Sequence, residues 1–165
     1  MLLYRILCAG FVAWAANLVI GRPEAASVVE TFPEVATIVP LAGALVGFQN
    51  LAPRQGWGLL VAIANGIWGG VLVIGWSFLA IVTLAAAFSP QLMRGDVNGA
   101  GRVMSDTTIE LADLLANVPL IGLFLTAAGV ASIVTEGVHW LLVHMRRLRG
   151  VQEREERRAH RPSMY

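Results

Sequence analysis

The sequence predicts an all-α membrane protein with four transmembrane helices and an interfacial helix before the fourth. Hydrophobic residues make up 56% of the 165 residues and charged residues only 14%, and the mean hydropathy is +0.67. Four apolar segments approach the roughly 20 residues that a helix needs to cross a bilayer core of about 30 Å. Backbone groups in lipid must bond within their own helix, so these segments are expected to be helical.

The first two predicted spans are residues 6–21 and 35–51. The first is apolar except for Asn17, and the second begins shortly after Phe32-Pro33-Glu34. The charged start of the chain and the apolar stretch behind it are also typical of a secretory signal. We expect the first helix to be retained, because cleavage at Ala13-Trp14-Ala15 would leave too short an apolar region.

The third predicted span, residues 57–88, is longer than a bilayer requires. It must therefore tilt or protrude from the lipid. The following apolar region contains Pro119, and proline suits the first turn of a helix. We expect the fourth span at residues 119–144.

An additional helix is predicted in front of the fourth span. Thr107 and Glu110 have capping-box spacing, which predicts that a helix begins near Thr107. We interpret residues 107–118 as an amphipathic helix that lies at the membrane surface.

The arginine distribution predicts that both chain ends lie in the cytoplasm. Cytoplasmic loops retain positive charge, and an even number of spans places both ends on one side. All 12 basic residues are arginine, which we attribute to a GC-rich bacterial genome. Nine are then inside (Arg5, Arg54, Arg146, Arg147, Arg149, Arg154, Arg157, Arg158 and Arg161) and three outside (Arg22, Arg94 and Arg102). Trp57 and Trp140 fall near the inner boundary, as aromatic belt residues should.

The composition changes abruptly after the fourth span, which separates a transmembrane domain, residues 1–145, from a charged tail, residues 146–165. One interpretation of the tail is a positive-inside anchor with a frayed end. The other is a docking segment for a partner protein or anionic lipid that uses Arg146, Arg147 and Arg149. No long basic run exists outside the tail, which argues against nucleic-acid binding.

Glu136 is the most conspicuous candidate for a functional residue, because an ionisable group inside a span is costly. It lies eight residues before His144, and Asn65 lies eight residues after Trp57. Both are then about 12 Å from the inner boundary at 1.5 Å per residue. We predict a hydrogen bond between Asn65 and Glu136. The pair would serve either proton or cation handling or, as we favour, helix pairing.

Two arginines at the inner surface, Arg5 and Arg54, are the alternative charge partners for Glu136. Their long side chains could reach the carboxylate from the boundary of the membrane. The sequence leaves the choice between an amide and a charged partner open.

Metal and catalytic chemistry have little support. Glu136 and His139 have the Glu-x-x-His spacing of di-iron bundles, but no other span carries an acidic residue to complete such a site. The histidines share one helix and its tail, which excludes haem with two axial histidines. His139 alone could ligate a chlorophyll-type pigment, although an interfacial side chain is the commoner explanation. No nucleophile-and-base motif or phosphate loop occurs, so neither an enzyme nor a cofactor is predicted.

Glycines form the clearer pattern. Gly43 and Gly47 are a GxxxG pair in the second span, and Gly66 and Gly70 are another in the third, with Gly69 beside them. Small residues let helix backbones approach closely in lipid. We interpret the first pair as packing inside the bundle, and the third span has enough glycine to bind another chain as well.

The chain resembles the TrgA family of small four-helix membrane proteins, which are associated by name with tellurite resistance. The resemblance rests on Gly43 to Gly47 before a turn at Pro53-Arg54, on Asn65-Gly66, and on a glycine-containing fourth helix. In that helix Glu136 is followed by Trp140 and Arg146-Arg147. The resemblance implies a protein of the bacterial inner membrane and supplies no catalytic residues.

These observations predict a non-enzymatic accessory or scaffold protein of the inner membrane. It would bind a larger membrane complex or act in stress (tellurite) resistance through partners. The glycine faces and the basic tail favour a membrane-protein partner or a second copy. The alternative is a small oligomeric transporter or proton channel built around Asn65 and Glu136.

Overall fold

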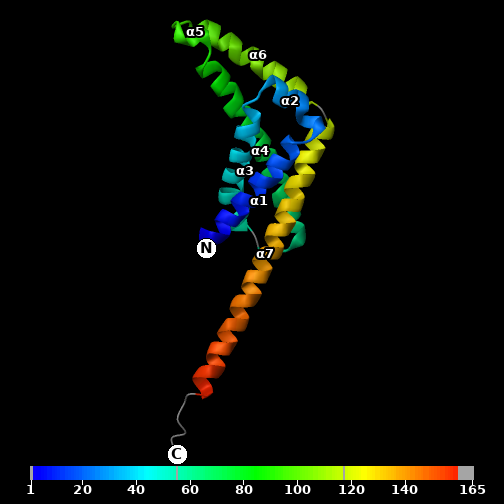
Figure 1. The fold of residues 1–165 in the computed structure, drawn as a ribbon, viewed down its shortest axis with the longest axis vertical. Coiled ribbons are helices and arrows are strands. Elements are labelled where there is room, and N and C mark those ends of the chain that lie inside the picture. The colour runs from blue at the N-terminus through cyan, green and yellow to red at the C-terminus, as the bar shows by residue number, and fades with distance from the viewer. Residues whose placement is uncertain (1, 55, 117, 160–165) are drawn as a thin grey trace, which may run out of the picture.

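A computed structural model describes residues 2–54, 56–116 and 118–159, and within these ranges every regular element is a helix. Four segments are long and apolar enough to cross a membrane: Leu2–Ile20, Val35–Arg54, Leu59–Ala87 and Pro119–Arg149. The predicted all-helical fold with four helices of spanning length is confirmed. Figure 1 shows these helices gathered into one bundle.

The first two long helices run antiparallel. α1 (Leu2–Ile20) leads through the short turn η1 (Pro23–Ala25) and α2 (Ala26–Thr31) into α3 (Val35–Val46). The chain then continues helically as a π-turn, η2 (Gly47–Leu51), and a 3-10 turn, η3 (Ala52–Arg54). Together α3, η2 and η3 supply the second segment of spanning length.

The second half of the chain forms another antiparallel pair. α4 (Leu59–Ala87) leads into α5 (Pro90–Met93) and α6 (Val97–Leu115), and α7 (Val118–Ala159) returns along α4. α6 lies over the end of the bundle where α2 also lies, and it packs mainly on α4 (Figure 1). The buried core consists largely of valine, leucine and alanine side chains from α1, α3, α4 and α7.

The predicted start of the additional helix at Thr107 is wrong. α6 begins at Val97, and its N-cap is Asp96, whose carboxylate accepts a hydrogen bond from the Gly99 N–H at 2.9 Å. Thr107 lies buried in the middle of this helix. A capping box serves only the unpaired N–H groups of a first turn. The same spacing inside a helix therefore has no capping function, and here it marked no boundary.

Glycines bring α3 against α1. A Cβ atom added to Gly47 would lie 2.7 Å from the carbonyl oxygen of Cys8. One added to Gly43 would lie 3.1 Å from the carbonyl oxygen of Val12. Because the obstructing atoms at Gly47 belong to the backbone, a side chain there would push the two helices apart, and at Gly43 it would be tightly packed.

Glycines likewise bring α4 against α7. A Cβ atom on Gly66 would lie 2.7 Å from the carbonyl oxygen of Ala128, and one on Gly70 would lie 3.0 Å from the Ala128 Cβ. Gly69 instead faces Leu51 of η2. Gly66, Gly69 and Gly70 of the third span therefore face neighbouring segments of the same chain.

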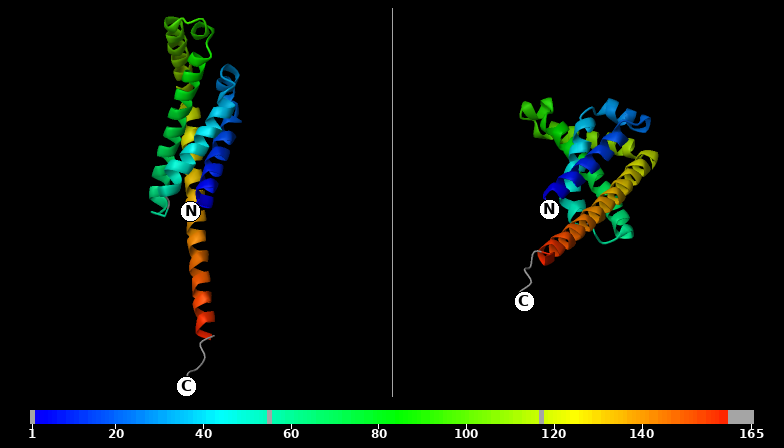
Figure 2. Two further views of the ribbon diagram at one scale, coloured as in Figure 1. Left: turned by 90° about the vertical axis from the view of Figure 1, so that its left-hand side faces the viewer. Right: turned by 60° about the horizontal axis from the view of Figure 1, so that its bottom comes forward.

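α7 is one continuous helix of 42 residues. At 1.5 Å per residue it is about 63 Å long, roughly twice the thickness of a bilayer core. Its second half projects away from the bundle, at the end where α1 begins (Figures 1 and 2). We call residues 146–159 the α7 extension; the predicted tail residues 160–165 lie outside the described residues.

Candidate functional site

Polar groups from three parts of the chain meet at the end of the bundle from which the α7 extension projects. We call them the Glu136 cluster. They come from the start of α1, from the turn before α4, and from the middle of α7. The members are Tyr4, Gly56, Gly58, Ser132, Thr135, Glu136 and His139.

The Glu136 carboxylate is the centre of this cluster and is only 4% exposed. One oxygen, Oε2, accepts a hydrogen bond from the Gly56 N–H at 2.7 Å, and the other, Oε1, accepts one from the Gly58 N–H at 3.2 Å. Hydrogen bonds to an ionised acceptor are stronger than neutral ones. Glu136 is therefore placed to fix the turn before α4 against α7.

The backbone conformation of this turn strongly favours glycine. Gly56 has φ +95° and Gly58 has φ +102°, values that residues with a Cβ rarely adopt. Gly58 is also the N-cap of α4, and no side chain of its own caps the helix. The Glu136 carboxylate lies at this positive end of the helix dipole, where negative charge is favoured.

Tyr4 and His139 close one side of the cluster. The Tyr4 hydroxyl donates to the carbonyl oxygen of Thr135 at 3.0 Å, and the Tyr4 and His139 rings meet edge to face at 5.4 Å. A Cβ atom on Gly56 would lie 2.9 Å from His139 Nε2. His139 Nε2 therefore faces the glycine turn, and pigment ligation by His139 stays a prediction.

Ser132 joins α7 to α4 one turn further from this end. Its hydroxyl donates to the carbonyl oxygen of Ala62 at 2.6 Å, and the Thr135 hydroxyl donates to the carbonyl oxygen of Ser132 at 2.9 Å. A hydroxyl group that donates to a backbone carbonyl has a hydrogen-bond acceptor even inside an apolar bundle. The bond from Ser132 to Ala62 helps to fix the register between the two helices, whereas the bond from Thr135 lies within α7.

The predicted hydrogen bond between Asn65 and Glu136 is wrong. Gly66, next to Asn65, lies beside Ala128 and Ser132, whereas Glu136 lies beside Gly58. The prediction assumed that Trp57 and His144 mark the same depth. The observed register differs by about six residues, or about 9 Å at 1.5 Å per residue. Asn65 is half-buried on α4, and the predicted polar layer is not formed.

The two alternative charge partners do not reach Glu136 either. The Arg5 guanidinium lies over the Phe48 ring, 5.7 Å from its centroid, which is cation–π geometry. The Arg54 side chain is exposed at the end of η3. Within the described ranges Glu136 is thus held by backbone N–H groups and by no arginine. The sequence contained one signal of this arrangement, the Gly-Trp-Gly turn immediately before a span.

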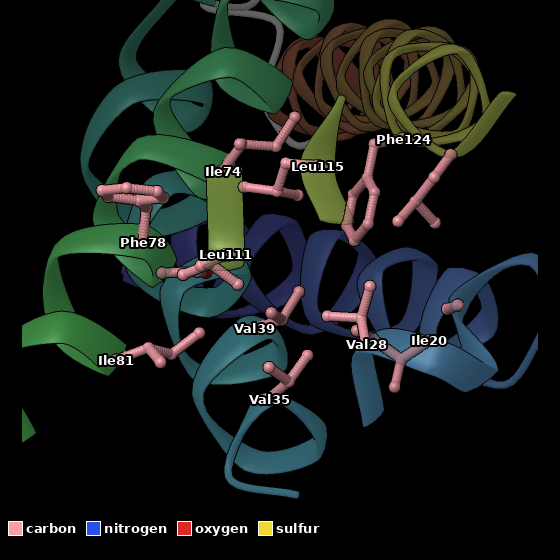
Figure 3. A pocket seen from close by; sticks show the side chains of 13 residues that line it. Ile20, Val28, Val35, Val39, Ile74, Phe78, Ile81, Leu111, Leu115 and Phe124 are labelled. Carbon is pink, nitrogen blue, oxygen red and sulfur yellow. The ribbon is translucent and has the colours of Figure 1, made fainter. Parts of the chain in front are cut away.

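An apolar cavity lies at the opposite end of the bundle, beneath α2 and α6. Figure 3 shows its lining, which includes Val28, Val39, Leu111 and Phe124. The cavity measures about 40 Å³, whereas a cavity that binds benzene measures about 150 Å³. The one polar side chain in its lining, Ser77, is buried, and its hydroxyl has no hydrogen-bond partner among the described residues. The space is too small for an organic substrate.

The fold and the Glu136 cluster define a small helical protein with four segments able to cross a membrane. In the described ranges no group of three or more His, Cys, Asp and Glu side chains could hold a metal ion. A comparison of the chain with protein-family models, curated proteins and solved structures finds no match.

Proposed function

We propose that this chain is an integral membrane accessory protein without catalytic activity of its own, which binds a larger membrane complex through the α7 extension. The four apolar helices would span the bacterial inner membrane, with the start of α1 and the α7 extension in the cytoplasm. We further propose that this complex acts in stress resistance, including tellurite resistance. The resemblance to the TrgA family supports this part of the proposal.

One observation carries the proposal: α7 continues as a helix far beyond the bundle. Short isolated helices are marginally stable in water. The side chains that the structure describes at its base, including Arg146, Arg147 and Arg149, are exposed, and so is Leu148 at 53%. A projecting helix of this kind gains stability when a partner covers it, because packing then adds to helix propensity.

The Glu136 cluster supports an architectural role. Both oxygens of the single acidic side chain in the four spans are used to hold the turn before α4. Proton or ion paths usually need a chain of polar groups that leads through the membrane. The Glu136 cluster lies at one end of the bundle, and the predicted hydrogen bond between Asn65 and Glu136 is not formed.

The test is gentle detergent extraction followed by native electrophoresis of two forms, the full chain and a chain that ends at Met145. We expect the full chain to migrate in a larger complex and the shortened chain to migrate alone. Arg102→Glu, on exposed α6, is the matched control for a change of charge and should leave the complex intact. Migration of the full chain only as a free monomer contradicts the proposal.

A further inference from the structure

We propose that the groove between α1 and α7 binds one membrane phospholipid, with an acyl chain along the groove and the phosphate at Arg22. The groove is lined by apolar side chains except near Arg22 and Thr126. Trp14 and Leu18 of α1 form one wall, and Leu123, Val130 and Val134 of α7 form the other. An apolar channel with a cation at one end matches an anionic amphiphile.

The size of the groove fits one acyl chain of one leaflet. Its volume is about 340 Å³, within the range of small-molecule sites. From Leu123 to Val134 the α7 wall is about 17 Å long at 1.5 Å per residue. This length is about half of a bilayer core, which is the depth to which one leaflet extends.

Arg22 supplies the charge complementarity. It lies two residues after the end of α1 and is the N-cap of η1, which leads into α2, so it lies at the end of the bundle that carries α2. No ion pair of Arg22 occurs within the part of the chain that the structure describes, so its guanidinium is available to a ligand. Arginine binds phosphate through two parallel N–H donors. Arginines at helix ends also extend their charged group to the membrane surface.

The walls of the groove face the lipid. Trp14 is 60% exposed and Val130 is 54% exposed, and neither has a covering segment among the described residues. This inference rests on the proposed membrane placement, in which such side chains contact acyl chains. A groove that follows the acyl-chain direction would hold a lipid longer than a convex helix face would, because the lipid is contacted from two sides.

The experiment uses the full chain in nanodiscs of phosphatidylcholine and phosphatidylglycerol that contain a trace of diazirine-labelled phosphatidylglycerol. Illumination is followed by mapping of the lipid-labelled peptides by mass spectrometry. Val130→Phe fills the groove, and Val71→Phe is its control on the exposed face of α4. Arg22→Gln removes the charge, and Arg102→Gln is its control on α6.

We expect labelling to concentrate on the two walls of the groove and both groove variants to lower it about tenfold. For Arg22→Gln this is the change expected for the loss of one charged hydrogen bond. The two controls should leave it unchanged. Equal labelling of all helices, or groove labelling that survives Arg22→Gln, overturns the proposal. A dimer that Val130→Phe dissociates would show that a second copy fills the groove and also overturns it. If no helix is labelled, the membrane placement itself has failed.

Discussion

Glu136 holds the start of α4 to α7 through the N–H groups of Gly56 and Gly58. Glu136→Gln keeps the shape of the side chain but removes the charge and one acceptor oxygen. We expect the free energy of unfolding to fall by about 1–3 kcal/mol, as for other buried hydrogen bonds to charged groups. Titration with a denaturing detergent measures it. Glu34→Gln, which is exposed, is the control, and equal stability of the two variants would contradict the role of Glu136.

Substitutions at the two glycines of the turn before α4 distinguish the cost of backbone strain from the cost of steric crowding. Gly56→Ala and Gly58→Ala both place a Cβ at positive φ, which costs about 1–3 kcal/mol. Only the Cβ at Gly56 also meets another side chain, His139 at 2.9 Å, whereas Gly58 has open space around it. We therefore expect Gly56→Ala to destabilise the protein more than Gly58→Ala does.

A double-mutant cycle tests the part played by His139. Combining His139→Ala with Gly56→Ala removes the crowding but keeps the strain, so the double variant should be more stable than the two single changes predict. Coupling of contacting residues amounts to about 0.5 kcal/mol or more. The coupling energy between His139→Ala and Gly58→Ala should be close to zero. Equal coupling of His139→Ala with both glycine substitutions would show that His139 does not cover Gly56.

The contact between α4 and α7 depends on Gly66. A Cβ there would lie 2.7 Å from both the Ala128 carbonyl oxygen and the Ser132 Cβ, so Gly66→Ala must push the helices apart. We expect a loss of about 1–3 kcal/mol in the free energy of unfolding, as for other overpacked positions. Gly75 has nothing within 4 Å, so Gly75→Ala on the same helix should stabilise by up to about 1 kcal/mol through helix propensity. The reverse order would contradict the packing described here.

The helices themselves were predictable to different degrees. The four long ones follow from apolar length alone, since a segment without polar interruptions can satisfy its backbone only as a helix in lipid. The apolar pattern does not predict the start of α6 at Val97, because Gly99 and Gly101 and the polar residues around them interrupt that pattern. The sequence signal for this start is Asp96, whose side chain caps the first turn.

The candidate site was predictable in part. The burial of Glu136 follows from its position within a span, since a carboxylate there must face the bundle and be bonded. Its partner depends on the register of α4 against α7. That register is set by the close approach of Gly66 to Ala128 and Ser132 and by the hydrogen bond from the Ser132 hydroxyl to the Ala62 carbonyl oxygen at 2.6 Å. No estimate of depth from apolar boundaries has that precision. The backbone N–H groups of a glycine turn also carry no side-chain signature.

At the scale of the whole molecule, the two ends of the bundle differ in character. One end carries α2, α5 and α6, and the other carries the start of α1, the Glu136 cluster and the base of the α7 extension (Figure 1). Four helices of spanning length alternate in direction between these ends. If they cross a bilayer, the two ends must lie in different compartments, and the α7 extension can meet only partners on its own side.

Cysteine labelling with a membrane-impermeant maleimide tests this placement most directly. With Cys8, which is buried, replaced by alanine, single cysteines are introduced at the exposed positions Arg54, Ser105 and Arg149. We expect Arg54→Cys and Arg149→Cys to react only from the cytoplasmic side and Ser105→Cys only from the opposite side. Labelling of Arg54→Cys and Arg149→Cys from opposite sides, or of all three from one side, would contradict a four-span protein with both ends in one compartment.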